Sequence, residues 1–296
     1  MKRILLLASV LMGFVLPGWG QDDPGKRGTI DYVRKLQTAT GGFLALQAKE
    51  NIKIAPTLKA TSSAIRALHY LGAEVPNKDA CAKFVASCFD KASGGFADLP
   101  GAQPDVFTTA VGMMAVTGLK LPVDSYGPGV IKFLSANAMS FEDIRIAAAG
   151  LERLGEKSPK TKAWLAEVLK LKNPDGTFGK GDGLARATGG SVVTLLRLGG
   201  TIENRDKVVK AIKDGQRNNG GFGKDDSPVN SDLETTYRVM RCFVMLKEQP
   251  QDAEGVRSFV AKCRNEDGGY GISPGQPSNA SATYFASIVL HWLNQR

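Results

Sequence analysis

Hydrophobic residues along the chain recur three and four positions apart, which predicts helices. Six segments are amphipathic, with Lys or Arg between the apolar residues, as in "IDYVRKLQ" (30–37). Each is followed by a segment richer in small and apolar residues, as in "TSSAIRALHYLG" (61–72). The first kind has one wet face and the second is apolar around most of its circumference, which predicts outer and inner helices. No run alternates with a period of two, so no sheet is expected.

A glycine-aromatic phrase punctuates the helical segments. It reads "GGF" from Gly41, Gly94 and Gly220, "GGY" from Gly268 and "DGTF" from Asp175. A sixth unit, "FLSANAMSFEDIRIAAAGLERLG" (133–155), has the helical pattern without the glycine pair. The units are about 40 to 50 residues long, which is typical of a repeat architecture. The glycines permit a left-handed backbone that reverses the chain, and we expect the aromatic ring to pack between neighbouring hairpins.

The six hairpins predict an all-α fold of two concentric layers. An open superhelix would leave both terminal repeats exposed, and neither end of the sequence reads as a polar cap. We therefore predict a closed α/α toroid, an α6/α6 barrel of twelve helices, in which residues 21–296 form a single domain. Four of the inner segments end in glycine, the usual helix terminator; these are Gly72, Gly118, Gly155 and Gly199.

The first twenty residues have the layout of a secretory signal peptide. Lys2 and Arg3 precede an apolar run, and Gly18 and Gly20 follow it. The run is short for a membrane span. We expect residues 1–20 to direct export to the periplasm or the extracellular space, and the mature chain to have no membrane span. A retained N-terminal anchor is the alternative.

Charge and cysteine content narrow the classes further. The formal net charge is +9, but the cations are scattered and do not alternate with aromatic residues, so nucleic-acid binding is not expected. Cys81 and Cys88 would be ~10 Å apart along one helix, too far to pair. Cys242 and Cys263 lie in consecutive helical segments and could form a disulfide after export. The pairing and the oligomeric state stay open.

The repeat phrases resemble a known superfamily. "GGFADLPGAQPDVFTTAVGMMAVTGL", from Gly94, resembles a repeat of the protein prenyltransferase β-subunits. "QTATGGF" and "QRNNGGFG", from Gln37 and Gln216, are similar to the Gln-containing repeats of squalene and other terpene cyclases. The resemblance covers all six units, roughly residues 28–295. It implies an α6/α6 toroid whose central cavity holds an isoprenoid.

The prenyltransferase resemblance also implies one zinc ion, held by an Asp-x-Cys pair and a His at the starts of inner helices. Asp232 is the only position here that matches a zinc ligand. The Cys position is Glu234, the His position falls on or next to Ala282, and the cognate position of the second unit is Thr108. Zinc prefers nitrogen and sulfur and needs three protein ligands. No cofactor is therefore expected, and zinc in particular is not.

Acids gather at the starts of the inner segments, where a toroid would place them around one mouth of its cavity; they are Asp105, Glu142, Asp143, Asp232 and Glu234. They could be a carboxylate pair of the kind that glycoside hydrolases use, or only residues that favour helix N-termini. The "DxDD" acid of terpene cyclases is missing, so cyclization is not expected. Ring closure would bring His69 and His291 side by side, for packing or for proton transfer.

Five arginines fall within the inner segments, where each must find a partner or reach the lumen; they are Arg66, Arg145, Arg186, Arg238 and Arg241. Glu234 before Arg238 is the favoured order for an ion pair on one helix. In the prenyltransferases basic cavity residues bind the diphosphate, and the resemblance opens that role to Arg238 and Arg145.

Three functions are consistent with these features. The first is an exported toroid without the zinc chemistry, which binds an apolar, isoprenoid-like ligand or a protein partner in its cavity. The second is an active prenyltransferase-like transferase with an altered site, and the third is a carboxylate-based carbohydrate-active enzyme. The candidate catalytic residues are Asp232 and Glu234. The candidate ligand-binding residues are Arg238, Arg145, Asp105, Thr108 and Tyr237. The identity of the ligand stays open.

Overall fold

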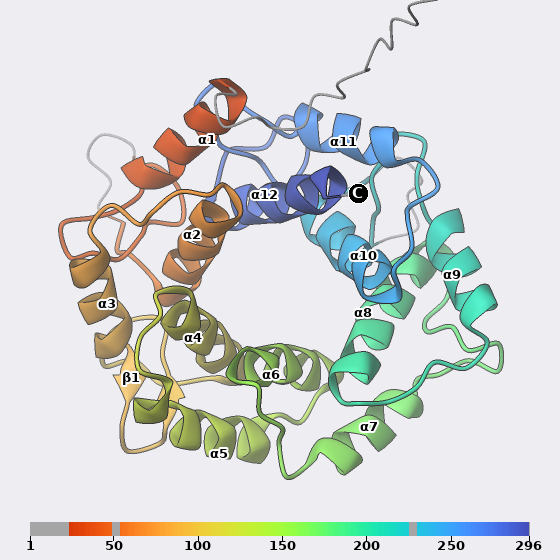
Figure 1. Cartoon of the computed structure of the whole chain (residues 1–296), viewed down its shortest axis with the longest axis horizontal. Coiled ribbons are helices and arrows are strands. Elements are labelled where there is room, and N and C mark those ends of the chain that lie inside the picture. The colour runs from red at the N-terminus through yellow and green to blue at the C-terminus, as the bar shows by residue number, and fades with distance from the viewer. Residues whose placement is uncertain (1–23, 49–53, 225–229, 296) are drawn as a thin grey trace, which may run out of the picture.

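Twelve α-helices alternate between an outer and an inner ring in the computed structural model, which describes residues 24–48, 54–224 and 230–295 (Figure 1). The outer helices are α1 (Pro24–Lys35), α3 (Lys78–Ser87), α5 (Gly127–Asn137), α7 (Thr161–Leu169), α9 (Arg205–Asp214) and α11 (Ala253–Lys262). The inner helices are α2 (Leu58–Tyr70), α4 (Val106–Gly118), α6 (Phe141–Leu154), α8 (Leu184–Arg197), α10 (Leu233–Leu246) and α12 (Ala280–Asn294). The predicted α/α toroid is confirmed. The expected signal peptide, residues 1–20, lies outside the described residues.

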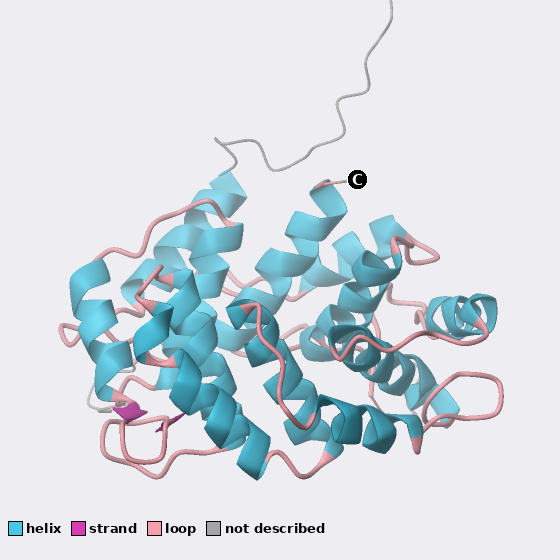
Figure 2. Ribbon diagram, turned by 60° about the horizontal axis from the view of Figure 1, so that its bottom comes forward, coloured by secondary structure: helices cyan, strands magenta, loops and turns pink. Residues whose placement is uncertain are grey.

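One small strand pair departs from the prediction of no sheet. Strands β1 (Phe89–Asp90) and β2 (Gly95–Phe96) pair antiparallel across one of the glycine turns, at the edge of the ring (Figure 2). Each strand has only two residues, which is too short for an alternation of apolar and polar residues to predict the strand pair. The expectation was therefore wrong at this turn.

Each glycine-aromatic turn is locked to the inner helix that follows it. The turn aromatics are at most 2% exposed; they are Phe43, Phe96, Phe178, Phe222 and Tyr270. Their backbone N–H groups donate, at 2.9 to 3.1 Å, to the hydroxyls of Thr61, Thr109, Thr188, Thr236 and Thr283, in the same order. The expected packing of the aromatic residues is confirmed, and the hydrogen bond to the threonine beneath each one fixes the turn to the inner helix.

The hairpin of α5 and α6 is built differently. Its short connection has no glycine pair, and Ser140 and Asp143 form a capping box at the start of α6. The backbone N–H of Ser140 donates to Asp143 at 2.9 Å, and that of Asp143 donates to the Ser140 hydroxyl at 3.1 Å. Asp143 therefore serves the helix start, as acids at helix N-termini commonly do.

Three of the four glycines that were predicted to end inner helices do so. Gly72, Gly155 and Gly199 have left-handed φ values of 68°, 71° and 81°. Gly118 instead remains the last residue of α4, and Lys120 takes the left-handed conformation with φ of 59°. A Cβ on Gly118 would press against the Ile65 side chain of α2. This glycine therefore permits close contact between α4 and α2 and does not terminate its helix.

The first and last repeats close the ring. Gly268, in the last turn, has φ of 86° and lies so close to Gly28 of α1 that a Cβ would overlap its backbone. Thr29 donates its hydroxyl hydrogen to the Gly268 carbonyl at 2.9 Å, and the hydroxyls of Ser63 on α2 and Ser281 on α12 lie 3.3 Å apart. The predicted closure is confirmed.

All four cysteines are free and buried in the structure. The disulfide considered for Cys242 and Cys263 is not formed in the structure, and each of these side chains packs in the apolar core. Burial raises the pKa of the Cys242 thiol to about 12. No helix in the described part of the chain is long and apolar enough to span a membrane.

Candidate functional site

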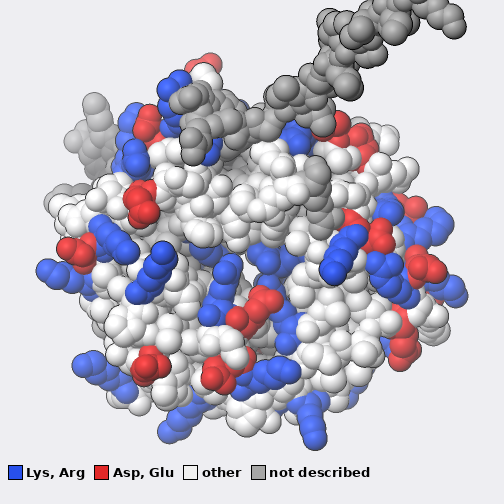
Figure 3. Space-filling model, viewed as in Figure 1, with Lys and Arg blue, Asp and Glu red and all other residues white. Residues whose placement is uncertain are grey.

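A cavity of about 420 Å³ lies at the centre of the ring and receives side chains from all six inner helices. In the face drawn in Figure 3 the molecule is hollowed at its centre, and charged side chains border the hollow. The apolar part of the lining includes Phe107, Val111, Met114, Ile146 and Phe285. The remainder is mostly cationic, with Lys59, Arg66, Arg145, Arg153, Arg197, Arg238 and Arg241 against Glu152 and Glu234.

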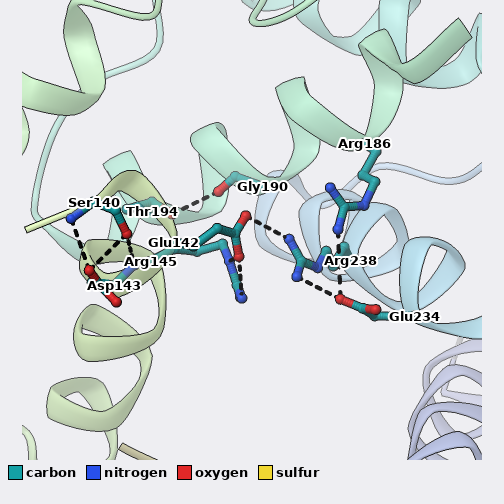
Figure 4. A network of polar contacts seen from close by, with 9 residues as sticks. All are labelled: Ser140, Glu142, Asp143, Arg145, Arg186, Gly190, Thr194, Glu234 and Arg238. Carbon is teal, nitrogen blue, oxygen red and sulfur yellow. Dashed lines mark hydrogen bonds and ion pairs between the residues drawn. The ribbon is translucent and has the colours of Figure 1, made fainter. Parts of the chain in front are cut away.

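A network of ion pairs spans the early turns of α6, α8 and α10 (Figure 4). Arg238 bridges two carboxylates, at 3.0 Å from Glu142 and 2.6 Å from Glu234. Arg145 holds Glu142 at 2.8 Å, and Arg186 lies 3.7 Å from Glu234. The predicted Glu234–Arg238 pair is therefore formed, and the network couples three neighbouring repeats.

The arginines hold the network in its charged form. Burial alone would raise the pKa of Glu142, but Arg145 and Arg238 outweigh it and lower that pKa. Burial likewise acts to lower the pKa of Arg238, while Glu234 and Glu142 raise it. A carboxyl that is held ionised is poorly suited to the proton donation that glycoside hydrolysis requires.

The sequence-predicted site residues divide into two groups. Glu234, Tyr237, Arg238 and Arg145 line the cavity. Asp232, Asp105 and Thr108 are not among the lining residues and make local contacts at helix starts instead. Asp232 caps α10 by accepting the Thr235 backbone N–H at 2.7 Å and its hydroxyl hydrogen at 2.8 Å.

Asp105 and Thr108 close the capping box of α4. The backbone N–H of Thr108 donates to the Asp105 carboxylate at 2.7 Å. The Thr108 hydroxyl also donates to the carbonyl of Phe96 at 2.6 Å. Both side chains are therefore engaged in holding the turn before α4.

These positions do not fit the zinc site of the prenyltransferases. Asp232 is committed to its helix cap, Glu234 is paired with Arg238 and Arg186, and Ala282 has no donor atom. Among residues 24–48, 54–224 and 230–295, no three His, Cys, Asp or Glu side chains are grouped so that they could hold a metal ion. The side chains at these positions therefore do not form the zinc site that the resemblance implies.

A second polar group lies further along the inner helices. The Arg66 guanidinium stacks 4.0 Å above the Tyr284 ring, and its Nε donates to the Ser62 carbonyl at 3.0 Å. The Arg241 guanidinium lies 4.8 Å from the ring of Trp292 and 5.3 Å from that of Tyr237. The hydroxyl of Tyr284 donates to that of Tyr237 at 3.3 Å. We call Arg66, Arg241, Tyr237 and Tyr284 the arginine–tyrosine cluster.

The arginines dominate the electrostatics of this cluster. Burial alone would raise the pKa of Tyr237, but Arg241, Arg66 and Arg197 stabilise its phenolate and lower the pKa to about 7. Burial and the neighbouring Tyr237 raise the pKa of Tyr284. The positive potential is therefore strong enough to ionise a buried phenol near neutral pH.

Sequence reasoning identified only part of this cluster. Tyr237 was a candidate ligand-binding residue, and Arg66 and Arg241 were recognised as charges in need of a partner. Tyr284 and Trp292 were missed. Helical spacing was the available signal for Tyr284, because it follows Ser281 by three positions on α12 and both side chains line the cavity.

The two histidines meet at the seam between α2 and α12. The Tyr70 ring lies 5.2 Å from the His69 ring and 5.1 Å from the His291 ring. Burial, followed by the charge of His69, lowers the pKa of His291. Neither histidine lines the cavity, and the seam is a packed aromatic contact.

The sequence matches a known protein family along most of its length. The family described as "Prenyltransferase alpha-alpha toroid domain" matches residues 6–76, 64–125 and 130–296. The Geranylgeranyl transferase type-1 subunit beta of Arabidopsis thaliana is 28% identical over 91 residues, which cover 30% of this chain and 24% of that protein. The chain therefore matches about a quarter of the length of this relative.

Three solved structures show the same fold. Candida albicans protein geranylgeranyltransferase-I complexed with GGPP has a TM-score of 0.63 and 14% identity, covering 81% of this chain and 84% of that one. Type II terpene cyclase MstE from Scytonema, in its apo form, has a TM-score of 0.60 and 9% identity, with coverage of 92% and 96%. A glycosidase variant in complex with glucose has a TM-score of 0.60 and 12% identity, with coverage of 92% and 95%. At these identities the likeness concerns the fold alone.

Proposed function

The chain belongs to the prenyltransferase alpha-alpha toroid family, and we propose that it binds an apolar, isoprenoid-like ligand in its central cavity without the zinc-dependent transfer reaction of the prenyltransferases. The observation that carries the proposal is the cavity itself. Its volume of about 420 Å³ lies in the range of small-molecule sites, and its wall combines apolar and aromatic side chains with convergent polar groups.

The similar structures support this class of ligand. The Candida albicans enzyme is complexed with GGPP, and a Scytonema cyclase structure holds geranylgeranyl dihydroxybenzoate as substrate. The cavity wall of the present chain offers Phe107, Val111, Met114, Ile146 and Phe285 to such a chain of isoprene units. Burying apolar ligand surface is worth about 25 cal/mol per Å².

The side chains at the family's metal positions support binding without transfer. Asp232 and Glu234 already have strong partners in the chain, and Ala282 cannot coordinate a metal. An active transferase with an altered site would need another means of activating its nucleophile. The sequence also lacks the DxDD string of terpene cyclases, and the cations that line the cavity would repel a carbocation.

The carbohydrate-active alternative draws on the mouth acids, and their geometry favours it less. Glu142 and Glu234 are bridged by one guanidinium, that of Arg238, which lies between the two carboxylates and pairs with both. Similarity to the fold of a glycosidase does not identify a catalytic residue in this chain. Export through residues 1–20 is part of our proposal, and it would place the protein where ligand carriage rather than isoprenoid synthesis is needed.

Calorimetric titration with farnesol tests the proposal, together with mass spectrometry of lipids extracted from the purified protein. Ala149 lines the cavity on α6, so Ala149→Trp should fill it and weaken farnesol binding by about tenfold or more. Ala163→Trp, at an exposed position on α7, adds the same bulk outside the ring and should bind as the wild type does. Equal farnesol affinity in both variants, or no binding to the wild type, would overturn the proposal.

A further inference from the structure

Tyr237 is the tyrosine of the arginine–tyrosine cluster that a ligand can reach. Tyr284 also lines the cavity, but this residue is only 2% exposed. Tyr237 is partly exposed and lines the same cavity from α10. A ligand in the cavity therefore has access to the hydroxyl of Tyr237, whereas Tyr284 acts on the ligand through Tyr237.

The groups around the Tyr237 oxygen are hydrogen-bond donors and cations. The Tyr284 hydroxyl donates to this oxygen at 3.3 Å, and the guanidiniums of Arg241, Arg66 and Arg197 act on it by their charge. In the described part of the chain, the Tyr237 hydroxyl donates no hydrogen bond of its own. These surroundings favour an ionised oxygen, which only accepts, over a hydroxyl whose hydrogen would lack a partner.

The charges of the cluster partly offset one another. Burial acts to raise the pKa of Tyr237, but Arg241, Arg66 and Arg197 outweigh it and lower that pKa to about 7. The resulting phenolate offsets positive charge of the arginines, and Arg197 also pairs with Glu152 at 2.9 Å. The phenolate would repel an anionic group that approached it and would attract a hydrogen-bond donor.

A hydroxyl group matches this environment, because it both donates and accepts a hydrogen bond. Its hydrogen can be donated to the Tyr237 oxygen, and its oxygen can accept an N–H of Arg66. The Arg66 guanidinium is held in place by the Ser62 carbonyl at 3.0 Å and by the Tyr284 ring at 4.0 Å. An ammonium group would also donate, but the guanidiniums of the cluster would repel its charge.

The apolar wall of the cavity meets the cluster at Met114. The Met114 sulfur lies 3.6 Å from the Arg66 guanidinium. From there Val111 and Phe107 continue the wall toward the start of α4. A chain of isoprene units that lies along this wall therefore has one end beside Arg66 and Tyr237 and its other end near the helix starts.

We propose that the Tyr237 oxygen accepts a hydrogen bond from the hydroxyl of an alcohol, so that the preferred ligand of the central cavity is a long-chain, isoprenoid-like alcohol. The inference rests on the proposed function and adds the head group and the orientation of the ligand. The hydroxyl lies at the arginine–tyrosine cluster, and the apolar chain extends toward the starts of the inner helices.

The strength of this hydrogen bond depends on the ionisation of Tyr237, because a bond to an ionised acceptor is roughly twice as strong as one to a neutral acceptor. The titratable and charged side chains around Tyr237 are Arg66 and Tyr70 on α2, Glu152 and Arg153 on α6, Arg197 on α8, Glu234 and Arg241 on α10 and Tyr284 on α12. His69 and His291 adjoin Tyr70 and do not line the cavity. We therefore expect the preference for an alcohol to rise with pH through about 7.

Farnesol and farnesyl methyl ether separate the donated hydrogen bond from the apolar chain, because the ether keeps the oxygen but has no hydrogen to donate. Calorimetric titration at pH 8.5 should show farnesol binding about tenfold more tightly than the ether. At pH 6 the preference should fall to about threefold or less. Tyr237→Phe should bind the two compounds equally at both pH values.

Tyr70→Phe is the matched control. The Tyr70 ring lies 6.3 Å from the Tyr284 ring but does not line the cavity, so this variant should keep the preference for farnesol. Tyr284→Phe removes the donor to the Tyr237 oxygen and should move the onset of the preference to higher pH, which a loss of packing alone would not do. The pH comparison in the wild type needs no variant, so it tests the proposal even if Tyr237→Phe fails to fold.

The outcomes distinguish this proposal from the proposed function. Equal binding of farnesol and the ether to the wild type overturns the alcohol site and leaves the apolar site standing, whereas binding of neither compound overturns both. A preference that persists in Tyr237→Phe, or that is as strong at pH 6 as at pH 8.5, overturns the role of the Tyr237 oxygen. Tighter binding of farnesyl phosphate than of farnesol at pH 8.5 would likewise overturn it, because the arginines would then select an anion.

Discussion

The hydroxyls of Tyr237 on α10 and Tyr284 on α12 lie 3.3 Å apart, so that the ionised form of one is stabilised by the proton of the other. Around Tyr237 stand Arg66 from α2, Arg197 from α8 and Arg241 from its own helix. Helices far apart in sequence thus fix the ionisation of one phenol. The consequences of this arrangement can be measured.

We expect the ultraviolet absorbance of the protein to show one tyrosine that ionises near pH 7, because the arginines lower the pKa of Tyr237 to about 7. Tyr237→Phe should abolish this step. Tyr284→Phe should shift it to higher pH, because the phenolate loses a hydrogen-bond donor. A wild-type titration with no phenolate below pH 9 would contradict the assignment.

The same pKa predicts how stability changes with pH. The phenol of Tyr237 has a folded pKa of about 7, below its ordinary value of 10. Its contribution to the free energy of unfolding is complete above pH 10, declines between 10 and 7 and is absent well below 7. Urea unfolding should therefore show the wild type gaining stability relative to Tyr237→Phe as the pH rises from 7 to 10. Parallel curves for the two proteins would exclude this linkage.

The threonine beneath each turn aromatic should contribute to stability. Thr236→Val keeps the shape of the side chain but leaves the buried backbone N–H of Phe222 without its acceptor. The expected cost is about 1 to 3 kcal/mol of unfolding free energy. Thr236→Ser retains the hydroxyl and should lose less. Equal losses in the two variants would attribute the effect to packing alone.

Ring closure can be tested at one glycine. Gly268→Ala imposes a left-handed φ on alanine and places a Cβ in the backbone of Gly28, so we expect a loss of roughly 3 kcal/mol or more. Gly275 has a similar φ of 78° but open space around it. Gly275→Ala should therefore lose only about 1 kcal/mol. The difference between their denaturation midpoints isolates the contact between the first and last repeats.

Asp232 distinguishes a helix cap from a metal ligand. Asp232→Ala should cost about 1 kcal/mol of stability without changing the metal content measured by mass spectrometry. Asp252→Ala removes the corresponding cap of outer helix α11 and should cost a similar amount. Stoichiometric zinc that is lost only in Asp232→Ala would support the transferase alternative instead.

The toroid could be predicted because its signals are local and repeated. Helical periodicity, glycine-aromatic turns and the absence of polar end repeats each recur or apply to the whole chain. The chemistry of the cavity was harder to predict from the sequence. Asp232 and Glu234 both stand at the start of α10, yet one caps the helix and the other faces the lumen, and only the helix rotation decides which. Likewise, the contact of Arg66 with Tyr284 depends on how the first repeat meets the last.

A closed ring has no terminal repeat at which fraying can start. Unfolding must therefore begin at a turn within the ring, and these turns are not equally stabilised. Among the hairpins as the structure describes them, that of α5 and α6 lacks the buried turn aromatic and its hydrogen bond to a threonine. We expect the backbone amides at the α5–α6 connection to exchange hydrogen earliest. Local unfolding at this one connection would then precede unfolding of the rest of the ring.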